Sequence, residues 1–214
     1  MALSPIVRVG ASGYINVVND AVIGMPTAPG GVGVTKFAGQ LGKLIELDDS
    51  QVRYNSAVGT VYGGVFQYVR LAASSAVPII GQQLFWDSLA NAADNLYQVT
   101  TSETAGTTDS AVNRAGTCLS ASLTVGNYTW IQISGPIFCK FRAVLTDPAA
   151  IGNPVYCAGA GGADLGFADV IENPGAASQQ DVTLFQRRYL GVARQLPVAG
   201  GLTLVDVPQM FLRG

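Results

Sequence analysis

Histidine is absent from the 214-residue sequence. It is the usual base for serine and cysteine nucleophiles and the commonest metal ligand, so its absence excludes Ser-His-Asp and Cys-His catalysis. A serine activated by lysine would need no histidine, but no Ser-x-x-Lys occurs, and the five-residue Gly-x-Ser-x-Gly elbow is also missing. The sequence therefore predicts a protein without a nucleophilic catalytic set.

Charge is also scarce. Only 12% of residues are charged, whereas soluble domains usually have roughly 25%. A surface with so few charges indicates that much of it faces other protein. The 12 Lys and Arg are scattered and the net charge is −2, so no basic patch is expected that could follow a nucleic-acid backbone.

Long apolar runs and a leader pattern are missing too. No apolar stretch approaches the ~20 residues that a membrane helix needs, and no charged region followed by an apolar segment opens the sequence. We therefore expect a soluble protein that neither crosses a membrane nor is secreted.

Cysteine occurs three times, at Cys118, Cys139 and Cys157. An odd number cannot form a closed set of disulfides, which favours a reducing compartment. Free cysteine is commonly a small buried apolar side chain, and we expect this role for all three rather than a redox or metal role.

Carboxylates are the remaining route to catalysis or cation binding. The candidates are Glu46 with Asp48 and Asp49, and Asp164 with Asp169. Adjacent aspartates in a strand point to opposite faces, so Asp48 and Asp49 are expected in a solvated turn. A calcium site at Asp164 would need oxygen ligands at alternate positions, which this segment lacks. The sequence thus predicts no catalytic and no metal-binding residues.

Phosphate-binding loops are incomplete. The segment from Gly31 to Lys36 has two glycines of a dinucleotide fingerprint, but Lys36 stands where the third should be, and the Gly39–Lys43 segment lacks the spacing of a P-loop. No cofactor is therefore expected.

Alternating apolar and polar residues mark short strands bounded by Gly or Pro, at 65–71, 127–133 and 202–207. No window of a dozen residues keeps a helical stripe free of glycine; the nearest covers 37–45, and another short helix could lie at 88–95. The sequence predicts an all-β fold.

An internal duplication gives the organisation of this fold. Shifting the chain by 71 positions superposes glycines and apolar residues without a gap up to Val99 on Val170, and after a small length change the match resumes. The matched positions include Gly64 on Gly135, Phe66 on Ile137, Gly81 on Gly152, Leu84 on Val155, Gly116 on Gly191, and Gly126 on Gly200 or Gly201. We expect two tandem barrel-like or sandwich-like β units, 64–134 and 135–214, which can pack as one domain.

The first 63 residues match neither unit. Within them, the segment from Met25 to Gly33 is rich in proline and glycine and cannot be helical. We expect region 1–63 to contribute first strands and an extended arm able to lie over a neighbouring molecule.

Two tryptophans are candidate anchors for a partner. Large amphipathic aromatics dominate the energetics of interfaces, so Trp86 and Trp130 could contact another molecule. Packing in the core or at the mouth of a barrel is the more frequent role where a chain has few aromatics.

The first unit resembles the small phage head-decoration proteins. The resemblance covers Gly64 to Gly135 and rests on three motifs: Gly81-Gln-Gln-Leu-Phe-Trp-Asp87, Ala115-Gly-Thr-Cys-Leu-Ser-Ala121, and Gly126-Asn-Tyr-Thr-Trp-Ile-Gln-Ile133. The second unit departs from the pattern, with Cys157-Ala158 where Trp-Asp would stand.

This resemblance implies a bacteriophage capsid decoration, or cement, protein without catalytic residues. Such a protein binds the major capsid protein on the outside of the head and staples capsomers together, often as a trimer or dimer. It would be assembled in the host cytoplasm and reside on the virion surface. We expect the arm and exposed strand edges to make the contact.

Two other classes stay open. One is another virion component, such as a tail, fibre or major capsid protein, although the long helix and charged extended loop usual in a capsid protein are not found. The other is an enzyme or a carbohydrate-binding β module that uses carboxylates and Trp86 or Trp130.

Overall fold

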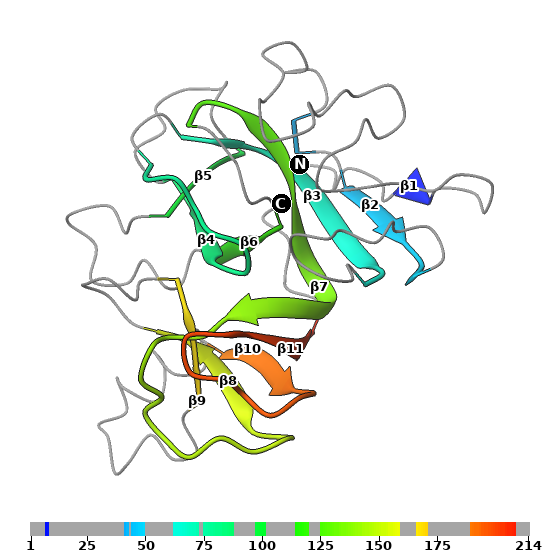
Figure 1. The fold of residues 1–214 in the computed structure, drawn as a ribbon. Coiled ribbons are helices and arrows are strands. Elements are labelled where there is room, and N and C mark those ends of the chain that lie inside the picture. The colour runs from blue at the N-terminus through cyan, green and yellow to red at the C-terminus, as the bar shows by residue number, and fades with distance from the viewer. Residues whose placement is uncertain are drawn as a thin grey trace, which may run out of the picture.

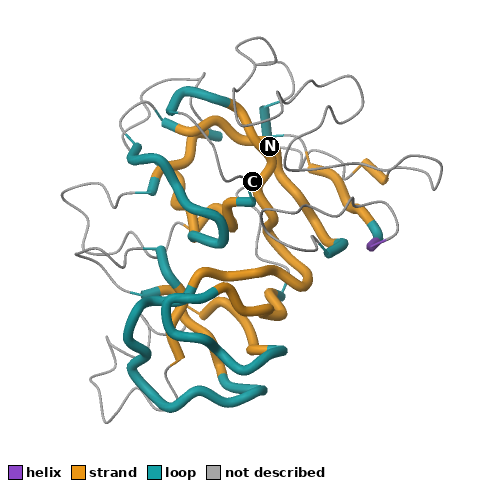
Figure 2. Tube along the Cα trace, viewed as in Figure 1, coloured by secondary structure: helices purple, strands orange, loops and turns teal. Residues whose placement is uncertain are grey.

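The computed structural model describes residues 7–8, 41–42, 44–49, 62–72, 75–87, 97–101, 114–119, 125–158, 166–170 and 189–208. Apart from a helical turn at Asp49, their secondary-structure elements are all strands, which confirms the predicted all-β class (Figures 1 and 2). The strands are β1 (Val7–Arg8), β2 (Leu44–Leu47), β3 (Gly64–Leu71), β4 (Gln83–Trp86), β5 (Gln98–Thr100), β6 (Arg114–Cys118), β7 (Tyr128–Lys140), β8 (Pro154–Cys157), β9 (Ala168–Val170), β10 (Tyr189–Ala193) and β11 (Leu202–Val207).

The three strands predicted from alternation are confirmed as β3, the first part of β7, and β11. Most of the predicted arm and the possible helix at 88–95 lie outside the described residues, whereas Leu44 and Ile45 of the other possible helix lie in strand β2. No helix in the described part of the chain is both long and apolar enough to span a membrane.

Five strands form a closed ring that we call barrel 1: β3, β5, β4, β6 and the first half of β7, residues 128–134. Neighbouring strands pair antiparallel, apart from the parallel pair of β3 with β5. The antiparallel pairing of β3 with β7 closes the ring. Closure leaves no free edge among these five strands.

A second ring, barrel 2, has the same order of strands. The second half of β7, residues 135–140, pairs with β11, then follow β10, β8 and β9, all antiparallel. A parallel bridge between Phe141 and Ala168 joins β9 back to the end of β7. The parallel contact thus occupies the same place in both barrels.

Strand β7 belongs to both barrels and bends where it passes from one to the other (Figure 1). At the bend, Gly135 has φ +96, and a Cβ there would lie 2.7 Å from the carbonyl oxygen of Gly63. Both facts require glycine. The buried side-chain amide of Gln132 donates to the carbonyl oxygens of Ser134 (3.3 Å) and Pro136 (3.2 Å), on either side of the bend. The boundary between the two sequence units therefore falls inside a continuous strand.

The cross-strand register recurs between the barrels, including a bulge. In barrel 1 β4 pairs with β6, and in barrel 2 β8 pairs with β10, each with one register shift. In barrel 1 the partners are Gln83–Thr117, Leu84–Gly116 and Phe85–Arg114. The corresponding partners in barrel 2 are Pro154–Val192, Val155–Gly191 and Tyr156–Tyr189.

Turn hydrogen bonds recur between matched positions. The amide of Gly81 donates to the carbonyl of Cys118, and that of Gly152 to the carbonyl of Ala193, both at 2.8 Å. The predicted match of Val99 with Val170 is displaced by two residues, so that Ala168 takes the place of Val99. The cause is a connection from β8 to β9 that is two residues shorter than the one from β4 to β5. The amide of Asp87 donates to the carbonyl of Gln98, whereas the amide of Ala158 donates to that of Phe167. Descent of both units from one duplicated ancestor stays a prediction.

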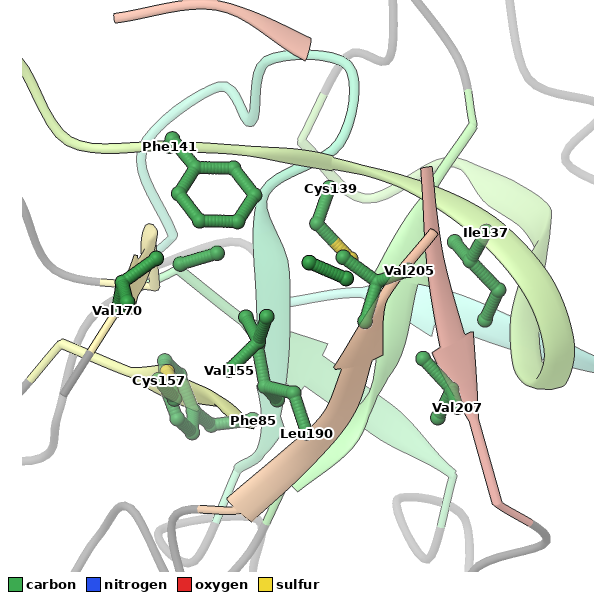
Figure 3. Close-up of a cluster of buried hydrophobic side chains, with 12 residues drawn as sticks. Phe85, Ile137, Cys139, Phe141, Val155, Cys157, Val170, Leu190, Val205 and Val207 are labelled. Carbon is green, nitrogen blue, oxygen red and sulfur yellow. The ribbon is translucent and has the colours of Figure 1, made fainter. Parts of the chain in front are cut away.

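Each barrel has its own buried core. The core of barrel 1 contains Leu44, Val65, Val69, Leu71, Leu84, Val99, Ala115, Cys118, Ile131 and Ile133. The core of barrel 2 contains Ile137, Cys139, Phe141, Val155, Cys157, Ala168, Val170, Leu190, Ala193, Val205 and Val207, together with Phe85 (Figure 3).

Phe85 is a residue of barrel 1 that packs in the core of barrel 2. Leu84 and Trp86 face the inside of barrel 1, so Phe85 points away from it and joins the buried cluster of barrel 2 (Figure 3). Backbone bonds fix this approach, since the amide of Lys140 donates to Gly81 (2.9 Å) and the amide of Gln83 donates to Gly166 (2.7 Å). The two barrels are thus held together by shared packing as well as by the shared strand.

We expect Phe85→Ala to lower the free energy of unfolding by about 3 to 5 kcal/mol, because it empties a site 1% exposed between the barrels. Val77→Ala, at a site 60% exposed, serves as control and should change it by less than about 0.5 kcal/mol. Denaturant unfolding followed by tryptophan fluorescence measures both. A cost for Phe85→Ala as small as the control's would contradict the packing described.

Candidate interaction site

The candidate carboxylates lie in different environments. Asp48 and Asp49 are exposed, as predicted for a solvated turn, and the carboxylate of Asp49 accepts a hydrogen bond from the amide of Gly63. Within the described residues no three His, Cys, Asp or Glu side chains gather where they could hold a metal ion. Asp164 lies outside those residues.

Asp169 is a structural anchor in barrel 2. Its carboxylate is buried and accepts hydrogen bonds from the guanidinium of Arg142 (3.0 Å) and from the amide of Thr146 (3.0 Å). The loop that follows β7 is thereby fixed to strand β9. A buried carboxylate that is saturated by partners holds structure together.

The three cysteines are buried, as predicted, and none of them forms a disulfide. Cys139 accepts a hydrogen bond from the side-chain amide of Gln83 (3.6 Å) at the junction of the barrels. Burial raises the pKa of the Cys139 thiol to about 12, while nearby Arg114 lowers it. Burial in turn lowers the pKa of the Arg114 guanidinium to about 10. A thiol held neutral in this way is a poor nucleophile.

The tryptophans have different environments. Trp130 is fully buried and its ring lies 5.0 Å from that of Tyr68, so it does not reach a partner from the surface. Trp86 is half-buried, packs on the core of barrel 1 and meets Tyr97 edge to face. Core packing therefore explains Trp130, and the packing of Trp86 at a barrel mouth leaves part of its ring accessible.

Exposed aliphatic side chains lie on two loops of barrel 2, 143–153 after β7 and 194–201 after β10 (Figure 2). Val144 is 72% exposed and Ile151 69% on the first loop, while Leu196 is 56% and Val198 55% on the second. We call these four side chains the loop end of barrel 2. Exposed aliphatic side chains on neighbouring loops are candidates for an interaction site.

Hydrogen bonds hold both loops in place. The amide of Gly200 donates to the carbonyl of Arg142 (2.7 Å), which ties the second loop to the start of the first. Within the loops, the side chain of Asn153 donates to the carbonyl of Pro148 (3.0 Å), and the amide of Val198 donates to the hydroxyl of Thr203 (3.1 Å). Such preorganisation reduces the entropy lost on binding.

Few of the described strands have a free edge. Apart from β1, each has a neighbour on both sides, although β9 joins the end of β7 only through the bridge between Ala168 and Phe141. Loops rather than edges thus offer the accessible contact surface in this part of the chain.

The sequence contains a signal for the loop end. Ile151, Leu196 and Val198 stand beside turn-forming residues, in Ala150-Ile151-Gly152 and Leu196-Pro197-Val198. Turns normally carry polar side chains, so bulky aliphatics in them indicate a surface kept for binding.

We expect Asp169→Asn to lower the free energy of unfolding by about 2 to 3 kcal/mol, because it leaves Arg142 without its charged partner. The exposed Arg194–Asp206 pair of the same barrel is a matched control, and Asp206→Asn should cost about 0.5 kcal/mol. Chemical denaturation of both variants measures the difference. Equal losses would show that Asp169 is not an anchor.

Because the pKa of the Cys139 thiol is raised, we expect the free energy of unfolding to fall at alkaline pH. Its pKa rises from 9.0 to about 12 on folding, so its contribution is complete below pH 9 and is lost as the pH rises toward 12. Cys139→Ala removes this titration. The stability gap between the protein and this variant should therefore shrink by about 1.4 kcal/mol per pH unit above about pH 9. Denaturation at a series of pH values tests this, and a constant gap would contradict it.

No known protein family and no curated protein matches the sequence. Among solved structures, the chain is similar to the N base of the head fiber protein gp8.5 of bacteriophage phi29, with 14% sequence identity and a TM-score of 0.38. The alignment covers 70% of this chain and 98% of that one. A TM-score this low does not establish a shared fold, so the similarity carries no conclusion about this protein.

Proposed function

We propose that the chain is a non-catalytic structural protein of a phage virion, which decorates the outside of the head and stabilises contacts of the major capsid protein. The observation that carries the proposal is the placement of the three motifs that resemble head-decoration proteins. They contain β4, β6 and the first half of β7, which are consecutive neighbours in the closed ring of barrel 1.

Barrel 2 has the same strand arrangement as barrel 1. Its sequence differs from the motif by Cys157-Ala158 in place of Trp-Asp, yet β8, β10 and β11 keep the order and register of β4, β6 and the first half of β7. Cys157 faces the core as Trp86 does, so the departure replaces one inward side chain with a smaller one.

The loop end of barrel 2 is the surface that we assign to the shell. Its four aliphatic side chains lose unfavourable contact with water when they are covered, and full burial of one such side chain is worth about 1.5 to 3 kcal/mol. The low overall charge suits a surface that lies against protein. A protein that binds only the assembled shell stabilises it by mass action.

The test is co-sedimentation with empty heads of the parent virus. We expect saturable binding that raises the melting temperature of the heads. Val144→Asp combined with Leu196→Asp should weaken binding by about tenfold or more, because both charges would be buried against the shell. Val77→Asp combined with Val125→Asp is the matched control on barrel 1, where both sites are exposed, and it should leave binding unchanged.

Three outcomes would overturn the proposal. Shells or tubes formed by the protein alone would favour a capsid or tail component. No binding to heads at any concentration would remove the decoration role. Saturable binding to a glycan that is lost in Trp86→Ala would favour the carbohydrate-binding module.

A further inference from the structure

The most exposed side chain of the loop end belongs to a short segment, residues 142–147, that lies against strand β9. Val144 is 72% exposed, whereas its neighbour Leu145 is partly buried and packs against the core of barrel 2. Residues two positions before and two positions after Val144 bind the same carboxylate, that of Asp169, which is 1% exposed. One buried carboxylate therefore spans the part of the loop that contains Val144.

Three hydrogen bonds from this segment converge on the Asp169 carboxylate. Oxygen Oδ2 accepts from the guanidinium of Arg142 (3.0 Å) and from the hydroxyl of Thr146 (2.5 Å). Oxygen Oδ1 accepts from the backbone amide of Thr146 (3.0 Å). The backbone amide of Arg142 also donates to the carbonyl of Ala168 (3.1 Å), the residue before Asp169. The segment is thus bound to β9 on both sides of Val144.

Arg142 also joins this segment to the second loop of the loop end. Its carbonyl accepts a hydrogen bond from the amide of Gly200 (2.7 Å). The guanidinium that binds Asp169 and the carbonyl that binds the second loop belong to the same residue. The carboxylate therefore holds Val144 in a fixed place relative to both loops.

A carboxylate supplies something at this position that an apolar side chain would not. Buried ion pairs can often be replaced by apolar residues of similar volume without loss of stability, so packing alone does not call for an aspartate here. Hydrogen bonds are directional, and those of Asp169 fix an exposed loop. A loop that is ordered before binding avoids the free-energy cost of being ordered by its partner. The benefit thus falls on the affinity for a partner.

We propose that Asp169 is a positioning residue for the contact with the shell: it holds Val144 in the place where the shell binds it. The proposal rests on the function proposed above and names how its contact surface is kept ready. Asp169 itself is buried and does not touch the shell. Loss of its hydrogen bonds lets the segment move and weakens binding, while the core of barrel 2 stays packed.

The test is a double-mutant cycle at Thr146, an exposed residue whose hydroxyl bonds to Asp169. Thr146→Val removes this hydroxyl and keeps the shape of the side chain, so it should weaken binding to empty heads by about threefold to tenfold. Thr146→Ser keeps the hydroxyl and should bind as the unaltered protein does. In a chain that carries Val144→Ala, Thr146→Val should have no further effect, because the side chain through which Asp169 acts is gone.

Amide hydrogen exchange tests the positioning without heads. Local opening controls exchange in a surface loop, so the amide of Thr146 should exchange about tenfold faster in Asp169→Asn than in the unaltered protein. Asp206→Asn, which breaks the exposed pair with Arg194, is the control and should leave this rate unchanged.

Three results would overturn the proposal: an unchanged exchange rate in Asp169→Asn, equal binding by Thr146→Val and Thr146→Ser, or a loss from Thr146→Val that persists in full in the Val144→Ala chain. The last result would mean that Asp169 supports the barrel without acting through Val144. Faster exchange in a protein that does not bind heads would overturn the decoration role, and not the part of Asp169 in holding Val144.

Discussion

The bend of β7 at Gly135 is the constraint on which the arrangement of the protein depends. One strand closes the first ring and opens the second, so the direction in which it leaves barrel 1 decides where barrel 2 can form. Glycine permits the turn, and the amide of Gln132 satisfies carbonyl groups on both sides of it. With the strand fixed, the start of β4 meets Lys140 and Gly166, and Phe85 reaches the second core.

Much of this fold could be predicted from the sequence, because tight turns need glycine and half-buried strands alternate apolar with polar residues. Gly81 and Gly152 have φ +81 and +89 and bond to corresponding carbonyls, as the offset of 71 suggested. The displaced register of Val170 was missed, since a loop two residues shorter changes which residues pair without changing the apolar pattern. The packing of Phe85 was missed as well. In the in-and-out pattern of a strand, an outward side chain that packs in another barrel occupies the same kind of position as one that faces water.

The candidate sites were harder to predict than the fold. The sequence showed what chemistry is missing, and it placed the cysteines in the interior. Exposure, however, depends on which segments come to cover a residue. Val192 and Thr117 hold matched positions, yet only Thr117 is covered. This difference arises from the relative placement of the barrels, which no local pattern encodes.

The continuous β7 strand also affects how the molecule bears force. A load applied between the two barrels runs along this strand, which forms ladders with β3 and β6 on one side of the bend and with β11 on the other. Hydrogen bonds perpendicular to a pull share the load and must break together, whereas a flexible linker would only extend. We therefore expect a force on one barrel to reach the other directly through this strand.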